Sequence, residues 1–352
     1  MTIGLPKGLL YYRYGILWEN FFTALGCKVL VSDDTNLSIF KQGAQDAVSE
    51  CCLPAKAYLG HVRSLLGRAN YILVPYATDK TGGDAVCVRF WGIGDVVRHT
   101  YPGTKLLEYD ICKNGSDFHG FKAMGKRLGK GNRMIRSAYV SAVEAQNLHD
   151  WKLRDMQKRS CISTGADSTD LRPAGVPFST QQKNLPISSK LKILVAGHPY
   201  VIHDPVIGGP VVKILSELGA VPLYSDRVDP KANLGLYRHI SPRLYWTANQ
   251  EIIGTIASLK AEVDGVLLLS TFPCAPDALA GEMTMRAVKD IPIIPILLDG
   301  LQGEAGLVTR LECFVDILSE RRNRRAGTIG NFLPPYGQLS RAYRTGAGHA
   351  VS

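Results

Sequence analysis

The sequence predicts an α/β fold made of two related, doubly wound lobes of the flavodoxin or Rossmann type, with a binding cleft between them. Three observations carry this prediction: short apolar runs alternate with longer amphipathic stretches, a ten-residue pattern occurs twice, and a polar segment separates the two copies. The apolar runs have the length of buried parallel strands. They are Thr2–Leu5, Lys28–Ser32, Tyr71–Pro75, Lys105–Tyr109, Lys192–Ala196, Ala220–Tyr224, Gly265–Ser270 and Ile293–Leu298.

The repeated pattern relates the two halves of the chain. Residues 24–33 resemble residues 217–226 at an offset of 193 residues, and the same offset aligns Pro6 with Pro199. In each copy a predicted helix ends at Leu-Gly, and the strand that follows leads into Ser-Asp. Glycine is typical of this helix end, because it adopts a positive φ without a Cβ penalty. The sequence therefore predicts two lobes of the same topology.

Four segments follow from this organisation. The first lobe is expected over residues 1–135 and the second over 190–320. Residues 136–189 are expected to join them, as a long helix over Arg136–Lys158 followed by a linker rich in Ser, Thr, Pro, Gly and Gln. Residues 321–352 contain Arg and Gly without apolar periodicity, which predicts a basic, flexible tail.

Charge and composition narrow the class of protein. The formal net charge is +10, and it is concentrated in residues 122–159 and 321–352. No nucleic-acid-binding motif accompanies these segments, so solvated surface is a better interpretation than nucleic-acid binding. No apolar run reaches the ~18 residues of a membrane helix, and the first residues lack the pattern of a signal peptide. We expect a cytoplasmic protein with reduced thiols.

Three of the eight cysteines lie at positions where α/β sheets bind ligands. Cys52, Cys87 and Cys274 each lie just after a predicted strand or just before a predicted helix, beside Pro or Gly. Three thiolates suit an iron–sulfur cubane with one further ligand, or part of a zinc site. Because the sequence has no Cys-x-x-Cys pair, buried cysteines without a metal remain the favoured interpretation from spacing alone.

The other five cysteines are interpreted as structural. Cys27 follows a helix-ending glycine, and Cys313 has the spacing of a buried helix face. Cys51 adjoins Cys52, and adjacent side chains diverge. The remaining two, Cys112 and Cys161, flank polar loops.

Three further residues are candidates for catalysis. His198 and Tyr200 follow a predicted strand, together with the His203-Asp204 pair, and could donate protons near neutral pH. A hydrogen-bonded turn explains this segment equally well. Glu304 lies in Gly303–Gly306, which is predicted to open a helix over 307–320 and so to favour an anion. A plain helix start is the alternative.

An ordered set of motifs resembles a known family. The chain is similar to the iron–sulfur components of 2-hydroxyacyl-CoA dehydratases and benzoyl-CoA reductases, and most similar to their activase-associated relatives. The resemblance spans most of residues 1–320. The motifs are Ile3–Gly15, Trp18–Phe22, Glu50–Lys56, Gly60-His61, Cys87–Gly92, Gly197–Pro205, Leu244–Trp246, Phe272–Asp277 and Gly303–Glu312.

The resemblance implies a cofactor and a partner. In the family pattern, the positions of Cys52, Cys87 and Cys274 are ligands of a [4Fe–4S] cluster in the cleft between the lobes. A separate ATP-dependent activase supplies the cluster with a low-potential electron, which passes to an acyl-CoA as a ketyl radical. The chain itself has no phosphate-binding Gly-x-x-x-x-Gly-Lys-Ser/Thr loop. It would act as an (R)-2-hydroxyacyl-CoA dehydratase-like lyase or an acyl-CoA reductase component, in a homodimer or a heterodimer.

Two departures from the family pattern leave other functions open. Asp299–Gln302 replaces the expected acidic-His-Thr run, and Phe272–Pro276 replaces the commoner Gly-Cys-Gly-Pro cluster loop. A non-catalytic electron carrier or cluster scaffold of the same family is therefore the main alternative. An α/β binding protein with inert cysteines is another. The substrate is not specified by any of these motifs.

Overall fold

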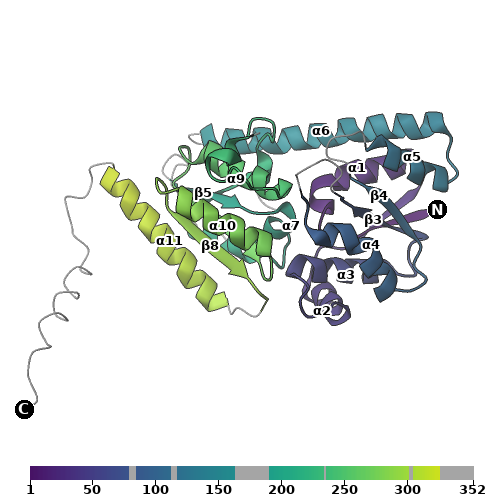
Figure 1. The fold of residues 1–352 in the computed structure, drawn as a ribbon, viewed down its shortest axis with the longest axis horizontal. Helices are drawn as coiled ribbons and strands as arrows, with labels where there is room; N and C mark the ends of the chain where they lie inside the picture. The colour runs from purple at the N-terminus through teal and green to yellow at the C-terminus, as the bar shows by residue number, and fades with distance from the viewer. Residues whose placement is uncertain (79–84, 112–116, 163–189, 234, 301–303, 326–352) are drawn as a thin grey trace, which may run out of the picture.

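The computed structural model describes residues 1–78, 85–111, 117–162, 190–233, 235–300 and 304–325. These residues form two four-stranded parallel sheets, each flanked by helices on both faces (Figure 1). This confirms the predicted fold class. No helix among the described residues is both long enough and apolar enough to cross a membrane.

The two sheets have the same strand order. The first has the order β2-β1-β3-β4 and the second β6-β5-β7-β8, and all pairs are parallel. The eight predicted runs all form strands, with ends that differ by one residue at most. The strands are β1 Thr2–Leu5, β2 Lys28–Val31, β3 Tyr71–Tyr76, β4 Leu106–Asp110, β5 Lys192–Ala196, β6 Val221–Tyr224, β7 Gly265–Thr271 and β8 Ile293–Leu298.

Helices connect and cover the strands. In the first half of the chain they are α1 Tyr11–Ala24, α2 Leu37–Asp46, α3 Leu53–Leu65, α4 Val88–Thr100, α5 Phe118–Arg127 and α6 Asn132–Ile162. In the second half they are α7 Pro199–Ile202, α8 Gly209–Glu217, α9 Thr247–Leu259, α10 Ala275–Ala287 and α11 Glu304–Arg325, with the short 3-10 helices η3 Ser225–Arg227 and η4 Leu236–His239.

Alternate strand residues enter separate cores on the two faces of each sheet. In β3, Leu73 packs in the core that contains Phe21 and Phe121, whereas Ile72 and Val74 pack with Val62 on the other face. In β7, Leu267 and Leu269 pack with α8 and α11, whereas Val266 and Leu268 pack with α9 and α10. Since successive side chains of a strand point to opposite faces, both sheets are buried on both sides, which requires their continuous apolar runs.

The repeated sequence pattern corresponds to a repeated structure in the two lobes. Gly26 and Gly219 follow α1 and α8, with φ values of 71° and 79°. A positive φ at the same place in both lobes is the reason for glycine in both copies of the pattern. Cys27, the next residue in the first copy, is buried, as its interpretation as a small apolar residue predicts.

The long helix α6 contacts both lobes. It starts at Asn132 and ends at Ile162, and so extends beyond both ends of the predicted Arg136–Lys158 helix. Its Gln146 side chain accepts a hydrogen bond from the Leu17 amide of α1. Near its other end, the Gln157 side-chain oxygen accepts from the Tyr224 amide of β6 at 2.8 Å. Figure 1 shows α6 lying along both sheets.

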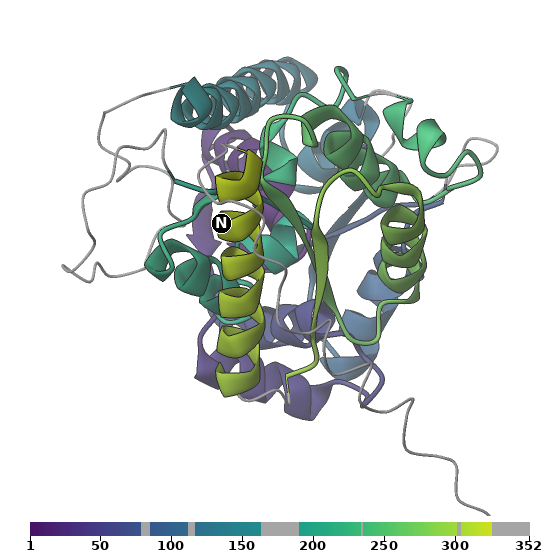
Figure 2. The same ribbon diagram turned by 90° about the vertical axis from the view of Figure 1, so that its left-hand side faces the viewer.

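Helix α11 covers the second sheet, and its course differs from what the sequence predicted. Figure 2 shows it lying across that sheet, with Leu311 and Phe314 in the core. It continues to Arg325, past Glu320, where the basic tail was expected to begin. Cys313 is exposed, so the prediction that it belongs to the buried face is wrong. The helix turns only part of its surface to the sheet, and Cys313 lies outside that part.

Candidate functional site

The three singled-out cysteines occupy equivalent local positions. Cys52, Cys87 and Cys274 are the N-cap residues of α3, α4 and α10, and all three are partly buried. Cys87 follows β3, and Cys274 follows β7, which is the corresponding strand of the other sheet. Free amides and the helix dipole favour negative charge at a helix N-terminus, which suits thiolates.

Tyr200 marks the place where the three thiols gather. Its pKa is raised well above the usual value by burial, and then by negative charge on Asp277, Cys87, Cys274 and Cys52. Charge on Cys87 also raises the pKa of both Cys52 and Cys274. Three loops from two lobes therefore bring their cysteines around one tyrosine.

Burial raises the pKa values of all three thiols. Burial raises the pKa of Cys52 and of Cys87, and the amide and guanidinium of Arg89 oppose this shift at Cys87. Burial also raises the pKa of Cys274, and the carboxylate of Asp277 adds to it. Without a cation the thiols stay protonated at neutral pH, whereas a bound metal favours the thiolate form.

The described side chains do not form a ready-made site for a single metal ion. Across the described residues, no three His, Cys, Asp or Glu side chains are close enough together to hold one metal ion. A [4Fe–4S] cubane takes its thiolates on separate irons, so its ligand sulfurs lie roughly 7 Å apart. Soft thiolates are also the ligands that such clusters use. The thiol donors of Cys52, Cys87 and Cys274 are chemically suited to such a cluster, and the cluster itself stays a prediction.

His198 and Asp277 form a buried ion pair beside the cysteines. The His198 Nε2 atom lies 2.9 Å from Asp277 Oδ1, and both side chains are about nine-tenths buried. Burial opposes charge on His198, but the Asp277 carboxylate outweighs it and raises the pKa of the imidazole. Burial likewise opposes ionisation of Asp277, and His198 outweighs it and lowers that pKa. Asn249 donates a further 2.8 Å hydrogen bond to Asp277.

Of the three residues that the sequence suggested for catalysis, the structure describes the side chains of two. His198 stacks on Tyr200, with ring centroids 4.9 Å apart and planes 7° apart, so both lie beside the thiols. Glu304 begins α11, but its side chain is outside the described residues, as are those of Cys112 and Cys161. Sequence reasoning assigned no role to Asp277 or Asn249. The spacing of Asp277, three residues after Cys274, was the available signal.

A buried network of side-chain hydrogen bonds joins the two lobes beside this site. Ser32 lies 2.9 Å from His61 Nδ1, and Thr35 lies 2.9 Å from His61 Nε2 and 2.5 Å from Asp204. Burial lowers the pKa of His61 to about 4, so its ring is neutral at pH 7. Because Thr35 donates to Asp204, it accepts from Nε2–H, and Nδ1 accepts from Ser32. Thr35 and His61 then each donate one hydrogen bond and accept one, and Asp204 is the final acceptor.

We expect this histidine to make folding sensitive to acid. Its pKa in the folded state is about 4 instead of 6.5, so the unfolded state binds more protons between these values. The free energy of unfolding should therefore fall as the pH decreases from 6.5 to 4, by up to roughly 3 kcal/mol. Urea unfolding of the wild type and of His61→Gln across this range measures it. Equal slopes for the two proteins would contradict the assignment.

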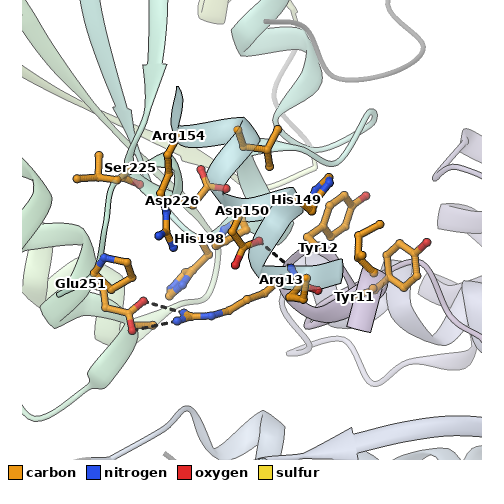
Figure 3. A pocket seen from close by; sticks show the side chains of 18 of the residues that line it. Tyr11, Tyr12, Arg13, His149, Asp150, Arg154, His198, Ser225, Asp226 and Glu251 are labelled. Carbon is orange, nitrogen blue, oxygen red and sulfur yellow. Dashed lines mark hydrogen bonds and ion pairs between the residues drawn. The ribbon is translucent and has the colours of Figure 1, made fainter. Parts of the chain in front are cut away.

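A cavity lies between the lobes on the other side of His198. Its volume is about 270 Å³, and its walls come from α1, α6, α9 and the loops after β5 and β6. Figure 3 shows Arg13 extending across it to Glu251, with hydrogen bonds of 2.7 and 3.2 Å. The same view shows Arg154, Asp150 and Asp226 around the hollow. His198 therefore lies between this cavity and the thiols.

The geometry agrees with one comparison to known proteins. A family model described as CoA enzyme activase uncharacterised domain matches residues 2–228, which include Cys52, Cys87, His198 and Tyr200 but not Cys274. No curated protein matches the chain. The resemblance to activase-associated relatives is thereby confirmed, whereas the resemblance to a dehydratase iron–sulfur component stays a prediction. Because the model covers more than half of the chain, this protein belongs to the family of the CoA enzyme activase uncharacterised domain.

Proposed function

We propose that the chain binds a [4Fe–4S] cluster through Cys52, Cys87 and Cys274. In this proposal it accepts a low-potential electron from an ATP-dependent activase, for radical dehydration or reduction of an acyl-CoA. Two observations support the proposal: Cys52, Cys87 and Cys274 each begin a helix, and charge on all three acts on the pKa of the same residue, Tyr200. The family match supports the connection with CoA enzyme activases.

The residues around the thiols have separate roles in this proposal. A bound cluster supplies one-electron transfer. The thiolates hold it, and the N-termini of α3, α4 and α10 offset their negative charge. Tyr200 and Phe90, whose ring centroids are 6.0 Å apart, would provide aromatic surface beside the cluster. His198, whose pKa is raised by the Asp277 carboxylate, would stabilise negative charge or donate a proton when protonated.

Reduction by an activase tests the electron-transfer part of the proposal. The chain has no phosphate-binding loop of its own, so it should not hydrolyse ATP alone. Mixing the anaerobically purified protein with an activase, ATP and a reductant should bleach its visible absorbance, and omitting either ATP or the activase should prevent this. Full reduction by dithionite without activase and ATP would contradict the low-potential mechanism.

A carrier without acyl-CoA chemistry is the second candidate, because Asp299–Gln302 and Phe272–Pro276 depart from the family pattern. Pockets that enclose drug-sized ligands measure roughly 300–1,000 Å³. The cavity of about 270 Å³ beside His198 is too small to enclose a complete CoA thioester. Calorimetric titration with acyl-CoA separates the candidates: binding supports the enzyme component, and its failure supports the carrier.

A further inference from the structure

The cavity between the lobes contains charged groups that the proposed cluster site does not use. Most of its carboxylates are bonded to donors: Glu19 accepts from Tyr11, Asp226 pairs with His203, and both Glu251 oxygens accept from Arg13. These pairs hold the walls together. The cavity is also larger than ordinary packing voids, which are rarely wider than a water molecule.

Three groups of α6 in the cavity wall have unused bonding capacity. Arg154 has one ion pair among the described residues, at 4.0 Å from Asp229, which is the outer limit for such a contact. No described residue hydrogen-bonds to the ring of His149. Asp150 accepts one hydrogen bond, from Gln146 at 2.7 Å, and its second oxygen accepts none from the described part of the chain. The carboxylate of Asp150 also acts electrostatically on Arg13 of the facing helix α1. The cavity thus places donors with spare capacity beside one acceptor oxygen that receives no hydrogen bond from the described residues.

The arrangement of these groups is unusual for a helix. Asp150 and Arg154 are one turn apart, where opposite charges commonly pair along a helix surface. Among the described residues they do not pair with each other, and Figure 3 shows both side chains extending toward the hollow. The other lobe contributes the loops after β5 and β6 through Gly197 and Ser225. Ligands of open α/β sheets bind at such carboxyl ends of strands.

We propose that this cavity binds a small zwitterion, of which a free α-amino acid is the simplest. Its carboxylate contacts Arg154 and His149, and its ammonium group contacts Asp150. The apolar walls at Ile16 and Ile252 face its side chain. A ligand that lacks one of the two charges makes fewer contacts, because it can satisfy either the guanidinium or the carboxylate but not both. Because Arg13 and Glu251 come from different lobes, the bound ligand lies against the contact that joins them.

Thermal unfolding of the complete chain tests the proposal. Each of the twenty standard amino acids is added in turn at millimolar concentration, and at least one should raise Tm, because it binds only the folded state. Calorimetry with that amino acid should give one site per chain. The deaminated acid and the decarboxylated amine of the same compound should bind more weakly. If no amino acid raises Tm, or if the deaminated acid binds as well, the proposal is wrong.

Matched variants identify the site. Arg154→Gln and Asp150→Asn should each weaken binding at least about tenfold, since each removes one charged partner. Lys158→Gln removes a positive charge from an exposed position one turn further along α6 and should bind like the wild type. The Tm of each unliganded variant shows whether it folds. Unchanged affinity in both cavity variants would overturn the assignment. Binding needs no cluster, so the iron content of the same samples separates this proposal from the proposed function.

Discussion

Replacing any one of Cys52, Cys87 and Cys274 by serine should remove the cluster or convert it to a form with less iron. The hydroxyl of serine is a poor substitute for a thiolate on iron. Each of the three helices begins with one such ligand. Among the described residues, the one adjacent thiol is that of Cys51, which is buried beside Cys52. Iron, sulfide and visible absorbance of the anaerobically purified variants measure the loss.

Cys313→Ser is the matched control for these variants. It makes the same atomic change at an exposed position on α11, which is none of the three helices that begin with a candidate ligand. It should retain the iron and sulfide of the wild type. Equal iron in all four variants would show that these cysteines hold no cluster.

Asp204→Leu should reduce the free energy of unfolding by about 3 kcal/mol or more. Asp204 is 1% exposed and accepts hydrogen bonds from Thr35, Tyr12 and the amides of Val206 and Ile207. Leucine accepts none, so four donors lose a buried partner, and each such loss costs roughly 1–3 kcal/mol where water cannot replace it. Urea unfolding at pH 7 measures the change.

Two further variants show that the effect belongs to the contact between the lobes. Asp316→Leu makes the same change at an exposed position of α11 and should stay within about 0.5 kcal/mol of the wild type. Thr35→Val removes the hydroxyl that lies between His61 and Asp204. Its effect and that of Asp204→Leu should not be additive, because the two residues are in contact. An additive pair, or a loss below about 1 kcal/mol for Asp204→Leu, would contradict the network.

The fold was predictable because its determinants are local. Continuous apolar runs indicated the strands, and glycines with positive φ indicated the ends of α1 and α8. The same strand order in both sheets follows from the repeated pattern. The length of α6 was harder to predict, since its first residues are polar and its end is set by contacts such as Gln157 with Tyr224. The exposed position of Cys313 shows that helical spacing alone does not identify which face of a helix packs against the sheet.

The site was predictable only in part. The cysteines and the His198–Tyr200 segment could be located because chemistry-bearing residues followed predicted strands. The pairing of His198 with Asp277 joins residues 79 positions apart, and the contact of Arg13 with Glu251 spans 238 positions. No local pattern encodes such contacts, which depend on how the lobes pack. The cavity arises in the same way, from α6 lying across both lobes.

The iron and sulfide content of protein purified without oxygen tests the central claim most directly. If Cys52, Cys87 and Cys274 hold one cubane, the chain should contain about four iron and four sulfide ions, with the broad visible absorbance of such a cluster. Oxygen should bleach it, because one iron has no cysteine ligand. A colourless protein without iron, or with stoichiometric zinc in its place, would contradict the claim.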